Sequence, residues 1–178
     1  GLREYRQGDN PRHIHWPTTA RMNELMVKQF EPLASACLCL ALDLSGGANV
    51  GQGKHATLEY AVRIAGSIAR FSCYNNIRTR MIGDGERRVD IDAGSGALQY
   101  GRILDELAVI DADGSTPYAE VLEALSARVV DGETVVVFLS QPPSESIDLA
   151  NAMTLLRARR VHLYAIVFER DSFAGMPR

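Results

Sequence analysis

Apolar runs alternate with amphipathic stretches along residues 36–168, and this alternation predicts a sheet covered by helices. Residues 36–42 and 134–139 are continuous apolar runs, which is typical of strands buried on both faces of a parallel sheet. Residues 55–74 instead carry apolar side chains at helical spacing. The whole pattern predicts strands at 36–42, 77–82, 86–91, 134–139 and 161–168, and helices at 55–74, 97–109, 117–129 and 146–159.

The order of these elements indicates an α/β fold. The segments 77–82 and 86–91 are joined by only three residues, so the two strands should pair antiparallel. The other strands are separated by helices, which favours parallel pairing. We therefore expect a doubly wound, three-layer sandwich with a mostly parallel sheet and one short antiparallel edge strand.

Candidate chemistry lies where the strands end, because ligands of such sheets bind outside the carboxyl ends of the strands. We expect the loops at 43–45, 114–116 and 140–141 to converge on one rim. Asp43, Ser45 and Thr116 would supply oxygen ligands that suit Mg²⁺ or Mn²⁺. The favoured alternative is that Asp43 and Ser45 cap a turn and Thr116 caps a helix, because only one carboxylate is present.

Other motifs are weaker. Residues 51–54 approach a phosphate-binding loop, but Ala48 stands in place of its first glycine and His55 in place of its hydroxyl. Nucleotide binding at Lys54 is therefore a minor hypothesis. His13 and His15 form an H-x-H pair without an evident third ligand, which is typical of surface or packing histidines. We find no Ser-His-Asp set and no paired catalytic carboxylates.

Composition sets the class of protein. A hydrophobic content of 46% and a charged content of 23% are ordinary for a soluble globular domain. The net charge of -3 without a basic stripe argues against nucleic-acid binding. No apolar run approaches the roughly 20 residues of a membrane span. Cys37, Cys39 and Cys73 are expected to be buried, reduced thiols.

Two further features concern the chain ends and the hairpin. The chain opens inside a polar segment and stops soon after a strand, so we expect a piece of a longer protein. Acidic side chains around the predicted hairpin should form a solvated edge that resists pairing between sheets: Asp84, Glu86, Asp90 and Asp92.

Residues 2–31 are polar and rich in aromatic and arginine side chains, without a clear helical or strand period. This segment resembles the signature of the bacterial domain-of-unknown-function 58 family, R-x-Y-x-x-G-D-x-x-R-x-I-x-W-x-x-x-A-R followed by L-x-V-[RK]. The family often has other residues where His13, His15 and Pro17 stand. The matching positions are Arg3, Tyr5, Gly8, Asp9, Arg12, Ile14, Trp16, Ala20, Arg21, Leu25, Val27 and Lys28.

The rest of the chain resembles the von Willebrand factor A-like domain that follows this signature in the family. The resemblance implies an N-terminal arm over residues 1–33 and a von Willebrand factor A-like domain over 34–178, cut short at its C-terminus. It also implies a metal-ion-dependent adhesion site, which Asp43, Ser45 and Thr116 match. Gly47 replaces its second serine and Gln141 stands near its final aspartate. We therefore expect a degenerate site with weak or no Mg²⁺ or Mn²⁺ binding.

The resemblance implies an interaction module and not an enzyme. Family members are similar to proteins encoded beside MoxR-type AAA ATPases, and many carry membrane spans upstream of the signature. We thus expect a domain on the cytoplasmic side of the inner membrane that assists chaperone-like assembly or maturation. The alternative is a metal-dependent hydrolase that uses Asp43. The signature residues Arg3, Tyr5, Gly8, Asp9, Arg12, Trp16 and Arg21 would either bind a partner or pair internally.

Overall fold

The chain divides into two compact units, Gly1–Ser35 and Ala36–Arg178. The structure, a computed structural model, describes residues 2–6, 11, 14–28 and 37–174. No helix in these segments is long and apolar enough to cross a membrane. The two units are described in turn.

The first unit contains two short antiparallel strands and one helix, although its sequence shows no clear period. Strand β1 pairs with β2, and Tyr5 N donates to Leu25 O at 2.7 Å to extend the contact. The Thr19 hydroxyl accepts a hydrogen bond from Met26 N at 3.0 Å and so holds the helix against β2. Met26 and Val27 are buried. The elements are β1 (Leu2–Glu4), α1 (Trp16–Met22) and β2 (Met26–Lys28).

His15 has a local structural role in this unit. Its Nδ1 lies 2.8 Å from Thr18 Oγ1 at the start of α1, and its backbone N donates to Met26 O at 2.8 Å. These contacts fit the prediction of a packing histidine. His13, the other member of the pair, lies outside the described residues.

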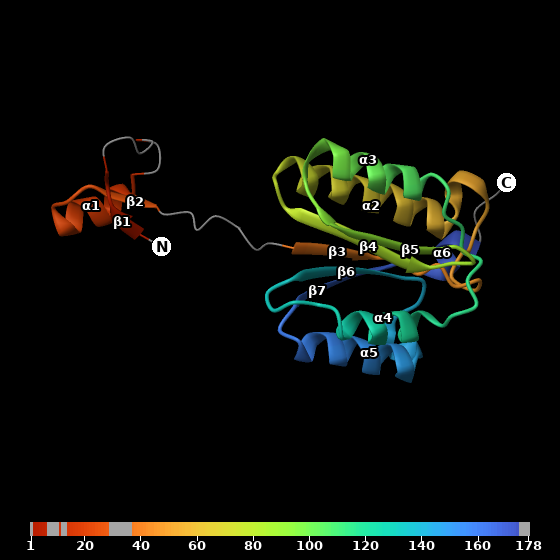
Figure 1. The fold of residues 1–178 in the computed structure, drawn as a ribbon. Helices are drawn as coiled ribbons and strands as arrows, with labels where there is room; N and C mark the ends of the chain where they lie inside the picture. The colour runs from red at the N-terminus through yellow and green to blue at the C-terminus, as the bar shows by residue number, and fades with distance from the viewer. Residues whose placement is uncertain (1, 7–10, 12–13, 29–36, 175–178) are drawn as a thin grey trace. The chain divides into compact units, whose positions relative to one another are not determined.

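The second unit is built on a five-stranded sheet in the order β5-β4-β3-β6-β7 (Figure 1). β3 pairs in parallel with β4 and β6, β6 pairs in parallel with β7, and β4 pairs antiparallel with β5. This confirms the predicted α/β fold with a mostly parallel sheet. The strands are β3 (Cys37–Ala41), β4 (Arg78–Asp84), β5 (Arg88–Gly94), β6 (Thr134–Leu139) and β7 (His162–Val167).

Helices cover both faces of this sheet, so the unit has three layers (Figure 1). One core cluster packs α2 and α3 against one face and includes Leu40, Met81 and Phe138. The other packs α4 and α5 against the opposite face, around Leu122 and Leu156. The helices are η2 (Gly53–His55), α2 (Thr57–Tyr74), α3 (Gly96–Leu107), α4 (Tyr118–Ser126), η3 (Pro143–Glu145), α5 (Ile147–Ala158) and α6 (Arg170–Ala174).

The antiparallel edge strand departs from the prediction in its length. β5 has seven residues, as many as β4, and it continues past the expected end at residue 91. A register shift between Thr79 and Met81 makes room for this extension. The Gln99 amide then donates to the carbonyls of Thr79 and Asp92, at 2.8 and 2.7 Å. A side chain from the next helix thus donates to backbone carbonyls that have no partner in the shifted ladder.

A buried ion pair ties the start of β6 to β4 across the central strand. Arg80 donates to the two carboxylate oxygens of Glu133, from Nε at 2.7 Å and from Nη2 at 3.0 Å. Glu133 also accepts from Val130 N at 3.1 Å. Both side chains are almost fully buried. Such a pair is costly to break, because either partner alone would be an uncompensated charge in the core.

The three cysteines are free thiols, and Cys39 and Cys73 are buried as expected. Cys37 is only half-buried, because it lies at the beginning of β3. Burial raises the pKa of the Cys39 thiol to about 12. Burial also raises the pKa of Cys37, and the nearby Glu133 carboxylate adds to this shift.

The buried ion pair gives a stability prediction. We expect Glu133→Ala to lower the free energy of unfolding by about 3–5 kcal/mol, since it leaves the Arg80 guanidinium buried without a counter-charge. Arg87→Ala is the matched control, because Arg87 pairs with Glu106 at 2.6 Å at the surface. That change should cost less than about 1 kcal/mol. Urea denaturation of both variants measures the difference, and equal losses would contradict the assigned role of Glu133.

Candidate rim pocket

Three loops meet at the carboxyl ends of β3 and β6, as the sequence predicted. Gly46 N donates to Gly114 O at 2.8 Å, and Gly114 N donates to Leu44 O at 2.9 Å. Ser45 and Gly114 form an isolated parallel bridge. The loop that follows β3 is therefore joined by backbone hydrogen bonds to the loop that precedes α4.

Gly114 is required by this contact. A Cβ atom at this position would lie against the carbonyl oxygen of Asp84 and 2.9 Å from that of Leu44. Both neighbours are backbone atoms, which cannot rotate away as a side chain can. Only glycine allows the approach of the three chain segments.

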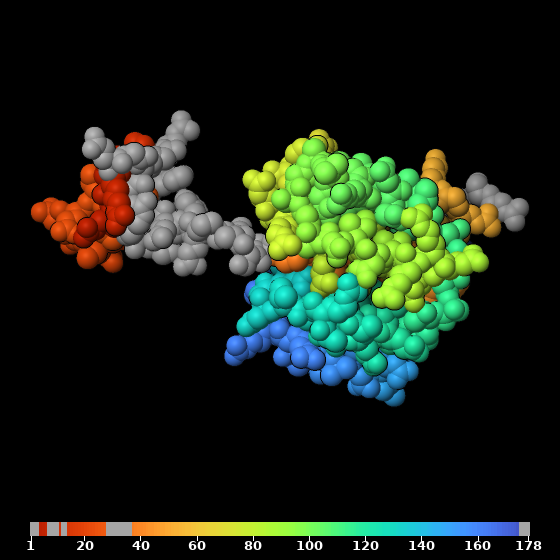
Figure 2. Space-filling view, in the orientation of Figure 1, coloured from red at the N-terminus to blue at the C-terminus, as the bar shows by residue number. Residues whose placement is uncertain are grey.

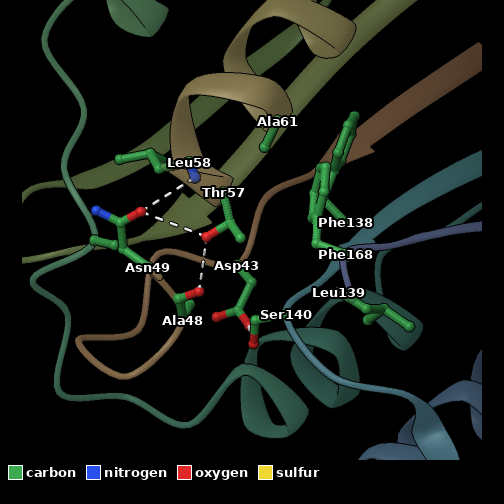
Figure 3. A pocket seen from close by; sticks show the side chains of 11 residues that line it. Asp43, Ala48, Asn49, Thr57, Leu58, Ala61, Phe138, Leu139, Ser140 and Phe168 are labelled. Atoms are coloured by element: carbon green, nitrogen blue, oxygen red, sulfur yellow. Dashed lines mark hydrogen bonds between the residues drawn. The ribbon is translucent and has the colours of Figure 1, made fainter. Parts of the chain in front are cut away.

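Asp43 lies at the centre of the rim. Its Oδ1 accepts hydrogen bonds from the hydroxyl and the backbone N of Ser45, at 2.7 and 3.2 Å. Its Oδ2 accepts from the Ser140 hydroxyl at 3.0 Å, and Figure 3 shows these two side chains close together. Hydroxyl donors thus engage both carboxylate oxygens. The capping interpretation holds for Asp43 and Ser45, with Ser140 as a partner that sequence reasoning missed.

Tyr118 stabilises the backbone close to Asp43. It is buried, and its hydroxyl donates to Ala41 O at 2.5 Å. Burial raises the pKa of Tyr118 well above its ordinary value, and the nearby Asp43 charge adds to this effect. The tyrosine therefore stays neutral and is a structural support for the strand that carries Asp43.

An open pocket of about 280 Å³ surrounds Asp43 and includes residues from the C-terminal part of the chain. Arg170 donates to Gly47 O at 3.0 Å across it. Phe173 fixes helix α6, because its ring packs edge-on against Tyr60 at 5.3 Å and Phe168 at 6.0 Å. The pocket is also lined by Ser45, Pro117, Tyr118, Ala119, Ser140, Gln141, Ser146, Asp148 and Leu149.

These donors do not fit a tightly bound divalent cation. The Gly47 carbonyl, at the position expected for a second hydroxyl ligand, already accepts from Arg170. Gln141 contributes a neutral amide, and the Arg170 guanidinium brings a positive charge. Among the described residues, no group of three or more His, Cys, Asp or Glu side chains could hold a metal. Hard cations need more carboxylate charge than this pocket provides.

Thr116 lines a different groove from the one around Asp43. That groove lies between α4 and the β4–β5 edge and includes Asp84, Arg88, Asp90 and Arg128. The predicted set of Asp43, Ser45 and Thr116 is thus brought together only in part.

The acidic edge beside Thr116 is largely solvated, as predicted: Glu86, Asp90 and Asp92 are exposed and Asp84 is half-buried. Asp90 also has a partner that the sequence did not predict. Arg128 donates to both oxygens of Asp90, at 2.8 and 2.9 Å. The Arg128 hydrogen bonds lower the pKa of Asp90 below its ordinary value. The edge strand β5 is therefore linked to the segment just after α4 by a bidentate ion pair.

The loop that resembled a phosphate-binding loop is held by its own side chains (Figure 3). The Thr57 hydroxyl donates to Ala48 O at 3.1 Å and accepts from Val50 N at 3.0 Å. Asn49 Oδ1 accepts from Leu58 N at 3.2 Å. Since these internal contacts already use backbone amides near the start of α2, the loop does not present them to a phosphate.

The signature residues belong to the first unit. Trp16 is 64% exposed, Arg21 is also exposed, and Tyr5 is half-buried. Gly8, Asp9 and Arg12 lie outside the described residues, and Arg3 is described only through its backbone in β1.

Sequence reasoning missed two residues that line the pocket and one that adjoins such residues in the sequence. Arg170 and Asp148 line it. Ile147, the first residue of α5, lies between the lining residues Ser146 and Asp148 and is 80% exposed. It is the most exposed large hydrophobic side chain in the described part of the chain. Ser146 caps α5, so Ile147 is an apolar residue at the first position of a helix. That position was a signal in the sequence that its side chain does not face the core.

Comparison with known proteins gives a family match and distant structural similarity. The family described as "Protein of unknown function DUF58" matches residues 1–172. The uncharacterized protein YeaD of Bacillus subtilis is 25% identical over 150 residues, which cover 84% of this chain and 36% of that protein. The chain thus spans about a third of the length of this curated relative.

Two solved structures share the fold at 14% identity. One is an aerotolerance-related membrane protein of Bacteroides fragilis, with a TM-score of 0.55 over 74% of this chain and 66% of that one. The other is the conserved hypothetical protein BatB of Bacteroides thetaiotaomicron, with a TM-score of 0.54 over 74% and 65%. The chain covers slightly less than two thirds of each.

The Asp90–Arg128 pair gives a prediction for pH dependence. In Arg128→Ala, the pKa of Asp90 should rise toward the ordinary value of about 3.9, because the hydrogen bonds that favour the carboxylate are gone. Since the folded-state pKa is lowered, the pair's small contribution to stability is present above about pH 4 and is lost as the pH falls through that pKa. NMR titration of the Asp90 carboxyl carbon measures the shift. Arg88→Ala is the control, with a smaller change expected from its 3.9 Å contact; equal shifts would contradict the assignment.

Proposed function

We propose that this chain, which belongs to the DUF58 family of proteins of unknown function, is a non-enzymatic protein-interaction module that uses the rim pocket around Asp43. The observation that carries the proposal is the exposure of Ile147, which lies in sequence between two residues that line the polar pocket. A large apolar side chain that no core contact explains is typical of a protein-binding surface when it is rimmed by polar groups.

The chemistry of the pocket supports binding over catalysis. The hydroxyls of Ser45 and Ser140 donate to Asp43, a carboxylate, which is a weaker base than the histidine that usually activates a serine nucleophile. The described residues that line the pocket include no His, Cys or Lys. What remains is a set of hydrogen-bonding groups that includes Arg170 and Asp148, which suits recognition of a polar segment beside an apolar anchor.

The partner that we propose is a MoxR-type AAA ATPase, and the process is chaperone-like assembly or maturation. This rests on the family resemblance, and the fold likeness to an aerotolerance-related membrane protein is consistent with a role at the membrane. In this proposal the parent protein is anchored upstream of this chain, and the module lies on the cytoplasmic side of the inner membrane. The von Willebrand factor A-like assignment, with a degenerate adhesion site, is part of the same proposal.

Binding of the ATPase encoded beside the parent gene tests the proposal. Ile147→Ala in the intact parent protein should weaken binding at least tenfold, because it removes the apolar anchor, and should leave the melting temperature unchanged because Ile147 is exposed. Leu98→Ala is the matched control, since Leu98 is 74% exposed on α3, a helix that contributes no residue to the lining of the pocket. Surface plasmon resonance with and without Mg²⁺ measures the dissociation constants. If the unchanged protein does not bind the ATPase with or without Mg²⁺, the proposal is wrong.

The alternative is a metal-dependent hydrolase. The observation that favours it is that two carboxylates, Asp43 and Asp148, line the same pocket. Calorimetric titration with Mg²⁺ and with Mn²⁺ separates the two proposals. We expect no saturable binding below about 1 mM, because the pocket lacks the carboxylate charge that hard cations need. Micromolar binding that is lost in Asp43→Asn would favour the hydrolase instead.

A further inference from the structure

A surface groove runs between helices α2 and α3, on the sheet face opposite α4 and α5, and has a volume of about 440 Å³. In Figure 2, α3 (green) forms the surface on this side of the second unit. Apolar side chains form part of the lining, including Val62, Leu104 and Leu107. Gly66 lies next to α3 in this lining, where a Cβ atom would make ordinary van der Waals contacts with Leu107 at 3.7 Å and Leu104 at 3.8 Å.

The charge of this groove has one sign. Its lining includes Arg63 and Arg70 from α2 and no acidic residue. The two arginines are seven positions apart, about two helical turns or 10 Å along one wall. Neither forms an ion pair within the segments that the structure describes, although Arg63 lies over the Tyr60 ring at 5.6 Å. An arginine pair without a carboxylate is a site for an anionic partner.

Aromatic side chains extend the apolar surface at one end of the groove. Tyr74 packs edge-on against Tyr100 with the ring centroids 5.8 Å apart. Tyr74 nevertheless remains 60% exposed, and Phe71, which follows Arg70 in α2, is 67% exposed. Since neither ring is needed to fill the core, this part of the surface is available for contact.

We infer that this groove binds an acidic amphipathic helix of a partner protein. An amphipathic helix can place apolar residues at i, i+3, i+4 and i+7 on the floor and its flanking carboxylates beside Arg63 and Arg70. The 12 residues of α3 correspond to about 18 Å, which accommodates roughly three turns. The charge complementarity selects acidic over basic helices. This site is separate from the rim pocket and does not depend on the role proposed for it.

A defined peptide tests the inference. The probe is a synthetic 14-residue helix with leucines at helical spacing and flanking glutamates, and its counterpart carries lysine in place of each glutamate. Fluorescence anisotropy with residues 1–178 should show saturable binding of the acidic peptide that weakens as salt is added. Arg70→Glu should weaken this binding at least tenfold. Arg102→Glu, an exposed position on α3 that does not line the groove, makes the same charge change and should leave binding within twofold.

Several outcomes would overturn the inference. These are no saturable binding at millimolar peptide, equal binding of the lysine peptide, or equal weakening by Arg70→Glu and Arg102→Glu. Concentration-dependent self-association that Arg70→Glu abolishes would show instead that a second copy occupies the groove. A failed ATPase pull-down leaves this test unaffected, so the two proposals are separable.

Discussion

The approach of three backbone segments at Gly114 is the constraint on which the rim depends. Leu44, Gly46 and Gly114 exchange hydrogen bonds, and the carbonyl of Asp84 leaves no space for a side chain. The loop after β3 is thereby fixed to the loop before α4. Because Asp43 and Tyr118 lie at the two ends of this junction, a change in the backbone contact would alter the carboxylate and its support together.

The second unit separates its binding surfaces from its stabilising interactions. The buried charge pair and the two apolar clusters lie within the layers, where they hold the strands in register. The rim pocket is built at the ends of strands, and the α2–α3 groove is built on the outer side of one helical layer. Substitution at either surface can therefore change recognition without a large effect on the core.

The sequence predicts the elements of this fold better than it predicts the contacts between them. Buried strands such as β3 and β6 are continuous apolar runs, so their presence and their parallel pairing follow from pattern alone. The partner of Asp43 could not be predicted in this way, since Ser140 lies 97 residues later and meets it only after β3 and β6 pair. Arg170 reaches the rim because the Phe173 ring holds α6 in place, and no local pattern contains that information. The extra length of β5 likewise depends on Gln99, a residue of the next helix.

The placement of the cysteines has a consequence for oxidative chemistry. A thiol reacts with peroxide as the thiolate, and a pKa of about 12 leaves Cys39 with a thiolate fraction on the order of 10⁻⁵ at neutral pH. Cys73 is enclosed in the core, where oxidants have little access. Sulfur thus fills space in the centre of this domain in an almost inert form, and Cys37, at the beginning of the central strand β3, is the thiol most accessible to an oxidant.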